Sequence, residues 1–78
     1  MSQYVSAQYD FGVTIVPSDV TIYDQGVNVY IGGAGNVTIK DMAGTALTFT
    51  APPVGSVLPV RARQVMAATT ATLLIGCW

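Results

Sequence analysis

Short apolar segments separated by turn-forming residues limit the possible folds of this chain more than any other feature. Runs of roughly five to seven residues rich in Val, Ile, Thr and aromatic side chains recur along its 78 residues, with Gly, Pro, Asp or Asn between them. Strands and turns have this pattern, and no stretch shows the spacing of an amphipathic helix. The sequence therefore predicts an all-β protein.

Side-chain alternation defines the expected strands and their inner faces. We predict strands within seven segments, 11–16, 20–23, 27–31, 36–40, 45–50, 56–66 and 71–78. Because successive strand residues point to opposite sides, the third segment places Val27, Val29 and Ile31 on one face. About seven short strands at this spacing favour a small antiparallel β-sandwich or barrel, jelly-roll-like in outline. We expect a single β domain over residues 11–78 and an N-terminal arm over residues 1–10.

Residues 36–50 are predicted to form a hairpin, because the loop Asp41-Met42-Ala43-Gly44 separates two alternating segments. Pro52 and Pro53 end the second of these segments, since neither proline can donate to a ladder. Pro59 indicates an edge position or a bulge in the segment that follows. In the last segment the two expected faces carry Leu73, Ile75 and Cys77 on one side, and Thr72, Leu74 and Gly76 on the other.

The low content of charge constrains what the protein does. Charged residues make up 9% of the chain, whereas an ordinary soluble domain carries about 25%. The net charge is −1 with three basic residues, so there is no basic face to neutralise nucleic-acid phosphates. With 51% hydrophobic residues, much of the surface must be apolar or built from small polar residues. Exposed apolar patches mark partner surfaces, so the composition predicts obligate assembly with other chains.

Signals for secretion or membrane insertion are not recognisable in the sequence. The opening MSQYVSAQYD lacks the basic and apolar regions of a signal peptide, and no run approaches the ~18 apolar residues of a membrane span. We therefore expect a protein made in the cytoplasm with no membrane partner. A single cysteine, Cys77, excludes an internal disulfide framework, which leaves oligomerisation as the common stabiliser for so small a domain.

The segment IGGAGNV, residues 31–37, contains three glycines and raises the question of phosphate binding. Dinucleotide-binding and P-loop motifs need a different glycine spacing followed by a helix, and the P-loop also needs a lysine. The alternating segment NVTIK follows instead. We interpret the glycines as a tight connection between two strands that requires positive φ.

Residues that carry catalysis in other proteins are sparse in this chain. No histidine occurs, which removes Ser-His-Asp chemistry and most zinc sites and leaves Cys77 without a base. We interpret Cys77 as a core thiol. The four aspartates lie among turn residues, where they are expected to bond to nearby backbone, and a calcium site is the alternative. The sequence thus predicts no enzyme, no cofactor and no metal site.

Three aromatic residues are candidates for partner binding. Tyr4 and Tyr9 lie in the first ten residues, where we expect them either in an arm draped on a neighbouring chain or in the core. Trp78, in the apolar last segment, is a candidate anchor for a partner because indole rings combine a large apolar surface with one polar group.

Two basic residues form a second group of candidates. Arg61 and Arg63 lie two apart in a predicted strand and should therefore point to the same face. Three roles are open to them: pairing with acidic groups of a partner, pairing with Asp19 or Asp24 in the same chain, or simple solvation at an edge.

The order of several motifs is more specific than any one of them. VPSDVTIY is followed by VYIGGAGNVTI, then by GTALTF, PPVGSVLPVRARQV and ATTAT. This order resembles the small spike base proteins of gene transfer agents and tailed phages, in which a TPSD turn precedes lYVGGAGDVTV, G-x-x-V-T-F, vPaGt-LPVRv-rV and TGTTAT. The resemblance covers about residues 13–76. Departures are Asn36 where Asp is common, Gln64 where Arg is common, and Cys77-Trp78 where Leu-Tyr is usual.

The resemblance implies a non-enzymatic structural protein of the virion. Such a protein is an oligomeric head decoration or spike base, a trimer or pentamer, seated on the major capsid protein at vertices and able to carry a head fibre or spike. The loop Gly32–Asn36 and the residues Pro59, Arg61 and Arg63 match recurring positions of the family, with no catalytic role attached to them. The alternatives are a capsid cement protein at local three-fold axes and a lectin-like carbohydrate-binding module that uses exposed tyrosines and turn aspartates.

Overall fold

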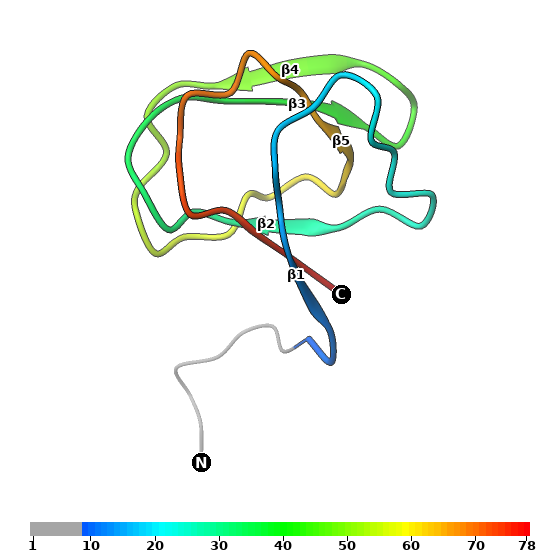
Figure 1. Ribbon diagram of the computed structural model, residues 1–78, viewed down its shortest axis with the longest axis horizontal. Helices are drawn as coiled ribbons and strands as arrows, with labels where there is room; N and C mark the ends of the chain where they lie inside the picture. The colour runs from blue at the N-terminus through cyan, green and yellow to red at the C-terminus, as the bar shows by residue number, and fades with distance from the viewer. Residues whose placement is uncertain (1–8) are drawn as a thin grey trace.

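The computed structural model describes residues 9–78, which form six strands and no helix. The strands, in chain order in Figure 1, are β1 Gly12–Thr14, β2 Asn28–Tyr30, β3 Val37–Asp41, β4 Ala46–Phe49, β5 Ala62–Val65 and β6 Ile75–Cys77. Gly, Pro, Asp or Asn residues lie in several of the connections between strands, and β3 ends at Asp41 itself. The prediction of an all-β protein is confirmed.

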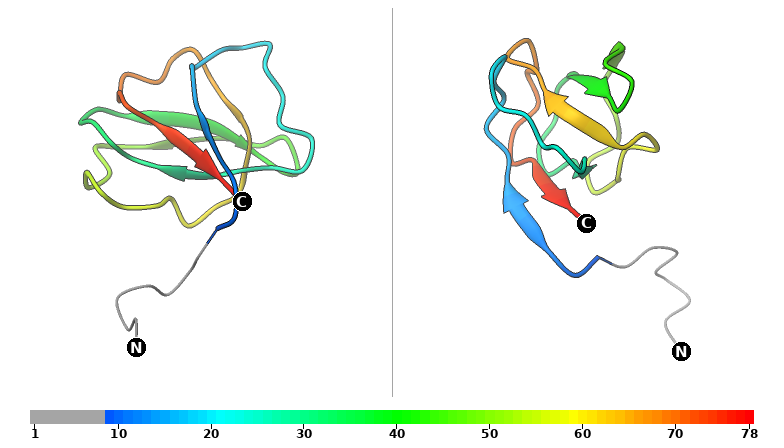
Figure 2. Two further views of the ribbon diagram at one scale, coloured as in Figure 1. Left: turned by 60° about the horizontal axis from the view of Figure 1, so that its bottom comes forward. Right: turned by 90° about the vertical axis from the view of Figure 1, so that its right-hand side faces the viewer.

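Two small antiparallel sheets of three strands make up the architecture. One sheet has the order β1-β6-β2 and the other has the order β4-β3-β5. Figures 1 and 2 show the sheets on opposite sides of the molecule, consistent with a small β-sandwich. Val27 and Ala62 exchange two backbone hydrogen bonds, of 2.8 and 2.7 Å, and so join the sheets next to β2 and β5.

The core lies between the two sheets and follows the predicted alternation. Val27, Val29 and Ile31 are buried, while Asn28 is half-buried and Tyr30 is exposed. The same alternation buries alternate residues of β3 and of the segment that ends in β6. The buried apolar side chains of the core are Ile15, Val27, Val29, Ile31, Val37, Ile39, Leu58, Ala62, Val65, Ala71 and Leu74. The predicted hairpin over residues 36–50 is confirmed, with Val37 paired to Phe49 and Ile39 paired to Leu47.

The strand predicted over residues 20–23 is wrong. This segment runs as irregular chain alongside β5, bonded at two points: the Ser18 amide donates to the Val65 carbonyl, and the Tyr23 amide donates to the Arg63 carbonyl. The residues between these two bonds form no ladder, so the β-prone composition of the segment yields no regular strand. Six strands result where about seven were expected.

The strand predicted over residues 56–66 is shorter than expected. Only Ala62–Val65 forms a strand, and Pro59 lies in a bend before it, although the sequence placed this proline in a strand edge or bulge. A bulge does occur later: Lys40 pairs with Gln64 while Asp41 pairs with Ala62, so Arg63 is an extra residue in β5. Arg61 and Arg63 were predicted to lie in one regular strand and point to the same face, but Arg61 precedes β5 and Arg63 is the extra residue of the bulge, so the regular alternation behind that prediction does not hold.

The glycine-rich segment connects β2 of one sheet to β3 of the other. A Cβ atom on Gly32 would overlap the backbone of Leu73, and one on Gly33 would overlap Thr72. Gly35 has φ of 143°, a value that L side chains rarely adopt. The prediction of a connection that needs positive φ is confirmed for Gly35, whereas the first two glycines serve the close approach of the chain that leads into β6.

Candidate interaction site

A hollow lies at one end of the core, where the inward-facing rows of β1, β6 and β2 continue past the strands. Phe11, Trp78 and Val27 are the next inward positions in these three rows. The hollow, of about 260 Å³, is lined by Tyr23, Asp24, Gln25, Gly26, Val27 and Trp78. Because it opens at the end of the core, Val27 and the rings of Tyr23 and Trp78 make its lining largely apolar. We call it the aromatic slot.

The wall formed by Trp78 is braced from behind. Its ring stacks on Phe11 with a centroid separation of 5.8 Å and an interplanar angle of 28°. The backbone of the two residues is also paired, since the Phe11 amide donates to the Trp78 carbonyl at 2.9 Å and the Trp78 amide donates to the Phe11 carbonyl at 3.0 Å. These bonds hold the indole in place at the mouth of the core.

The opposite wall is held by a turn. The Gly26 amide donates to the Tyr23 carbonyl at 2.9 Å, and Gly26 has φ of 78°. A side chain at Gly26 would overlap the aliphatic part of Arg61, whose guanidinium Nη1 donates to the Gln25 carbonyl at 3.1 Å. The turn therefore packs against Arg61, and Tyr23 is fixed relative to the strands.

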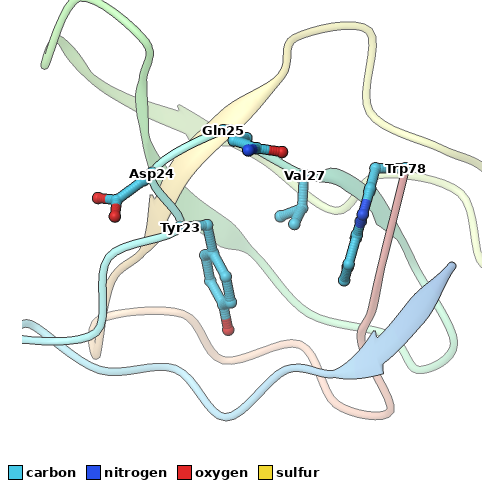
Figure 3. Close-up of a pocket in the computed structure, with 6 residues that line it drawn as sticks. Tyr23, Asp24, Gln25, Val27 and Trp78 are labelled. Carbon is cyan, nitrogen blue, oxygen red and sulfur yellow. The ribbon is translucent and has the colours of Figure 1, made fainter.

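The side chains around the slot leave its centre apolar. Figure 3 shows the rings of Tyr23 and Trp78 projecting to the same side, with the Val27 methyl groups between them. The Gln25 amide lies on the rim, whereas the Asp24 carboxylate points away from Trp78 (Figure 3). Such a slot accepts an apolar or ring-shaped group, with one amide available for a hydrogen bond.

A second surface, the outer face of the β1-β6-β2 sheet, is apolar where ordinary sheets are polar. The register places Ile75 opposite Tyr30, and Tyr30 bridges to Val57, so these three side chains form one row across the sheet. Each is between 36% and 39% exposed. Nearby in the chain, Leu73 is 75% exposed and has φ of 55°. We call Tyr30, Val57 and Ile75 the apolar row.

The outer face of the β4-β3-β5 sheet has the opposite character. Thr38 lies opposite Thr48, and their hydroxyl oxygens are 3.2 Å apart. Lys40 lies opposite Gln64, which is buried at 3% exposure because residues 17–23 cover it, and the Gln64 Nε2 donates to the Ser18 carbonyl at 3.2 Å. The two sheets therefore present a polar face and an apolar face to their surroundings.

The predicted partner-binding residues are dispersed over the molecule. Trp78 lines the aromatic slot, and Arg61 braces it through the Gln25 carbonyl. Arg63 is exposed in the bulge of β5, and Tyr9 is 36% exposed beside the start of β1. Tyr4 lies outside the described residues, as does most of the predicted arm over residues 1–10.

Of the four aspartates that the sequence assigned to bonds with nearby backbone, Asp41 makes such bonds, whereas Asp19 bonds to the distant Ala67. Asp41 Oδ1 accepts from the amides of Ala43 and Thr45, both at 2.9 Å, and Asp19 Oδ1 accepts from the Ala67 amide at 3.0 Å. Over residues 9–78, no three acidic, cysteine or histidine side chains gather in a way that would hold a metal ion. In the same part of the chain, no helix is long and apolar enough to cross a bilayer.

Cys77 differs from the predicted core thiol. It is half-buried and lies in the row with Gly12 and Asn28, on the side of the sheet away from the core. Its thiol donates to the Asn28 carbonyl at 3.2 Å, and burial raises its pKa. A raised pKa keeps the sulfur protonated, which is the reverse of what a nucleophile needs.

Sequence reasoning missed Tyr23, Gln25 and Val27 as parts of a site. Val27 was assigned to the core, where it also belongs, and Tyr23 was assigned to a strand that does not form. The available signal was the turn sequence Asp24-Gln25-Gly26 directly before a strand, combined with a tryptophan at an inward position of the last segment.

No protein-family model matches this chain, and no curated protein matches it.

Proposed function

We propose that this chain is a non-enzymatic structural protein of a virion, a homo-oligomeric head decoration or spike base held on the capsid surface. The resemblance over about residues 13–76 supplies the class of protein. In this proposal the domain is a jelly-roll-like β-sandwich that contacts the major capsid protein, a neighbouring copy and a fibre or spike. Its function in this proposal is to attach to the capsid and to connect it to the fibre or spike.

The observation that carries the assembly part of the proposal is the apolar row on the outer face of the β1-β6-β2 sheet. Tyr30, Val57 and Ile75 stand side by side on a face that also lacks charged residues at the paired positions Gly12, Thr14 and Asn28. Apolar surface that remains in water is unfavourable by about 25 cal/mol per Å² relative to its burial. A partner that covers this face gains that free energy, which suits a protein whose work is attachment.

Attachment is tested by a matched pair of lysine substitutions on the two outer faces. Ile75→Lys places a charge in the apolar row, and Thr48→Lys places the same charge on the polar face. If the row is the attachment surface, Ile75→Lys lowers the occupancy of the protein on purified particles imaged by electron microscopy, and Thr48→Lys does not. Equal occupancy of both variants would remove the row from the proposal.

Arg61 and Arg63 provide a second test of the same attachment. Both arginines are exposed, and Arg61 already bonds to the Gln25 carbonyl, which leaves other guanidinium donors for a partner. The double substitution of both residues by alanine is expected to weaken capsid attachment. Unchanged occupancy on particles shows that these side chains face away from the capsid.

The position on the particle separates a spike base from a cement protein. Density at five-fold vertices favours the spike base, and density at local three-fold axes favours the cement protein. Mass measurement under native conditions gives the matching oligomer, a pentamer or a trimer.

A lectin-like carbohydrate-binding module is the second candidate, because two aromatic rings flank the slot. Sugar rings stack their apolar faces on Tyr and Trp side chains. The turn aspartate in the slot lining, Asp24, points away from Trp78 (Figure 3), so it is poorly placed to bind the sugar hydroxyl groups. A stable monomer whose tryptophan fluorescence responds to simple sugars would favour this candidate over assembly.

A further inference from the structure

A rigid apolar projection lies at the far end of β2 from the aromatic slot. Pro53, Val54, Gly55 and Ser56 form a turn closed by a 3.1 Å bond from the Ser56 amide to the Pro53 carbonyl, with Gly55 at φ of 91°. The Gly55 amide also donates to the Ile31 carbonyl at 2.7 Å, which ties the turn to the end of β2. Val54, 58% exposed, stands at the tip beside Pro53. We call Pro53 and Val54 the knob.

The knob and the slot occupy opposite ends of one strand. The slot contains Val27, directly before β2, and the knob is bonded to Ile31, directly after it. Figure 1 shows the turn at residues 23–26 on the right of the molecule and the loop at residues 51–55 on the left. A single chain therefore cannot place its own knob in its own slot, but two copies arranged head to tail can join them.

We propose that the knob of one copy fills the aromatic slot of a second copy. Proline and aliphatic side chains dock well between aromatic rings, because both surfaces are apolar and the turn loses little conformational freedom on binding. No charged residue occurs between Thr50 and Val60, and the one charged residue of the slot lining, Asp24, points outward. The contact therefore buries no charged side chain, which would otherwise be costly.

A contact between two different surfaces of the same chain has a consequence for symmetry. Head-to-tail interfaces generate closed rings when the rotation between neighbours closes, and they do not produce two-fold dimers. A ring suits the trimer or pentamer expected for the proposed spike base. The inference rests on that proposed function, since it assumes that the chain assembles with copies of itself.

Two complementary variants test the junction in the full chain. Val54→Asp places a charge at the tip of the knob and keeps the slot, and Trp78→Ala removes one wall of the slot and keeps the knob. Trp78 is the single tryptophan of the chain, so Trp78→Ala carries no tryptophan, and in a mixture all indole fluorescence comes from the slot of the Val54→Asp copy.

Each variant alone is expected to self-associate more weakly than the unsubstituted chain, with an apparent dissociation constant of self-association raised about tenfold or more. At concentrations where the unsubstituted chain assembles, each variant should therefore be monomeric. The equimolar mixture is expected to form a heterodimer that grows no further, because it contains one intact junction. On mixing, the emission of Trp78 should shift to shorter wavelength as the knob covers the indole. Native mass spectrometry and fluorescence titration measure the two effects.

Control variants keep the result interpretable. Val20→Asp alters a valine that is 84% exposed and lies outside the knob and the slot, so its assembly should equal that of the unsubstituted chain. If circular dichroism shows that Trp78→Ala is unfolded, the double variant Tyr23→Ala with Trp78→Phe replaces it, since it keeps a ring against Phe11, removes the opposite wall and is also free of tryptophan.

The possible outcomes separate this inference from the proposed function. If the unsubstituted chain assembles and Val54→Asp assembles equally well, the knob-and-slot junction is wrong while assembly stands. If the mixture of the two variants shows no heterodimer and no shift in emission, the junction is also wrong. If the unsubstituted chain stays monomeric at every concentration, both the junction and the assembly part of the proposed function are overturned.

Discussion

Phe11, directly before β1, stacks on Trp78, directly after β6, with their ring centroids 5.8 Å apart. The two rings lie beyond the end of the core, where both are exposed, and the indole of Trp78 forms one wall of the aromatic slot. Because the same indole packs against the fold on one side and faces the slot on the other, stability and binding are coupled at this position. The effect of a substitution at Trp78 must therefore be measured both on the free energy of unfolding and on binding at the slot.

We predict that the stacked pair contributes to stability beyond the burial of each ring. In a double-mutant cycle with Phe11→Ala and Trp78→Ala, the coupling free energy should be about 0.5–1.5 kcal/mol, the range found for aromatic pairs. Urea denaturation at a concentration where the chain is monomeric measures it. A coupling free energy near zero would show that the rings merely lie near each other.

Gly32→Ala should destabilise the protein by about 1–3 kcal/mol, because the added methyl group overlaps the Leu73 backbone, which cannot move aside as a flexible side chain would. Gly12→Ala is the matched control, since a Cβ there meets its nearest atoms at an ordinary 3.7 Å. Comparison of the two free energies of unfolding tests the close approach. Equal values would mean that the connection at residues 31–37 has room for a side chain.

Gln64→Glu should lower the free energy of unfolding by about 2 kcal/mol or more at neutral pH. The substitution places a carboxylate in a site with 3% exposure whose partner is the Ser18 carbonyl, an acceptor. Gln64→Met, which keeps the shape and loses only the hydrogen bond, should cost about 1 kcal/mol. The loss from Gln64→Glu should shrink in acid, where the carboxyl group is protonated and becomes a donor. A loss that is independent of pH would contradict this explanation.

Burial raises the pKa of the Cys77 thiol above its ordinary value of 9.0. The protonated thiol is therefore favoured by folding, and its contribution to stability is fully present below pH 9 and is lost as the pH rises through the folded-state pKa. The free energy of unfolding of the native chain should fall more steeply above pH 9 than that of Cys77→Ser. Alkylation of Cys77 at neutral pH should also be slower in the folded chain than in urea. Identical pH profiles for the two chains would show that the thiol titrates normally.

The alternating strands were predictable because their burial is decided by neighbours in the sequence. Val29 and Val37 are buried and Tyr30 is exposed, as the period of two requires. The hairpin loop at Asp41 was predictable for the same reason, since the carboxylate bonds to amides two and four residues away. These features need no knowledge of the rest of the chain.

The site was not predictable, because it depends on contacts between distant segments. Tyr23 becomes a wall of the slot through a bond to the Arg63 carbonyl, forty residues later in the chain. Gln64 looks like an exposed strand residue, yet the distant segment at residues 17–23 covers it. The bulge at Arg63 likewise arises from the pairing of β5 with β3, and nothing in the local sequence marks it.

The position of β6 in its sheet has a consequence for how the protein is made. β6 comprises residues 75–77, it follows the other five strands of residues 9–78 along the chain, and it is the central strand between β1 and β2. Until residues 75–77 have left the ribosome, β1 lacks its partner strand and one edge of β2 stays unpaired. A chain truncated before residue 75 should therefore lose the β1-β6-β2 sheet as a unit rather than fray at one edge.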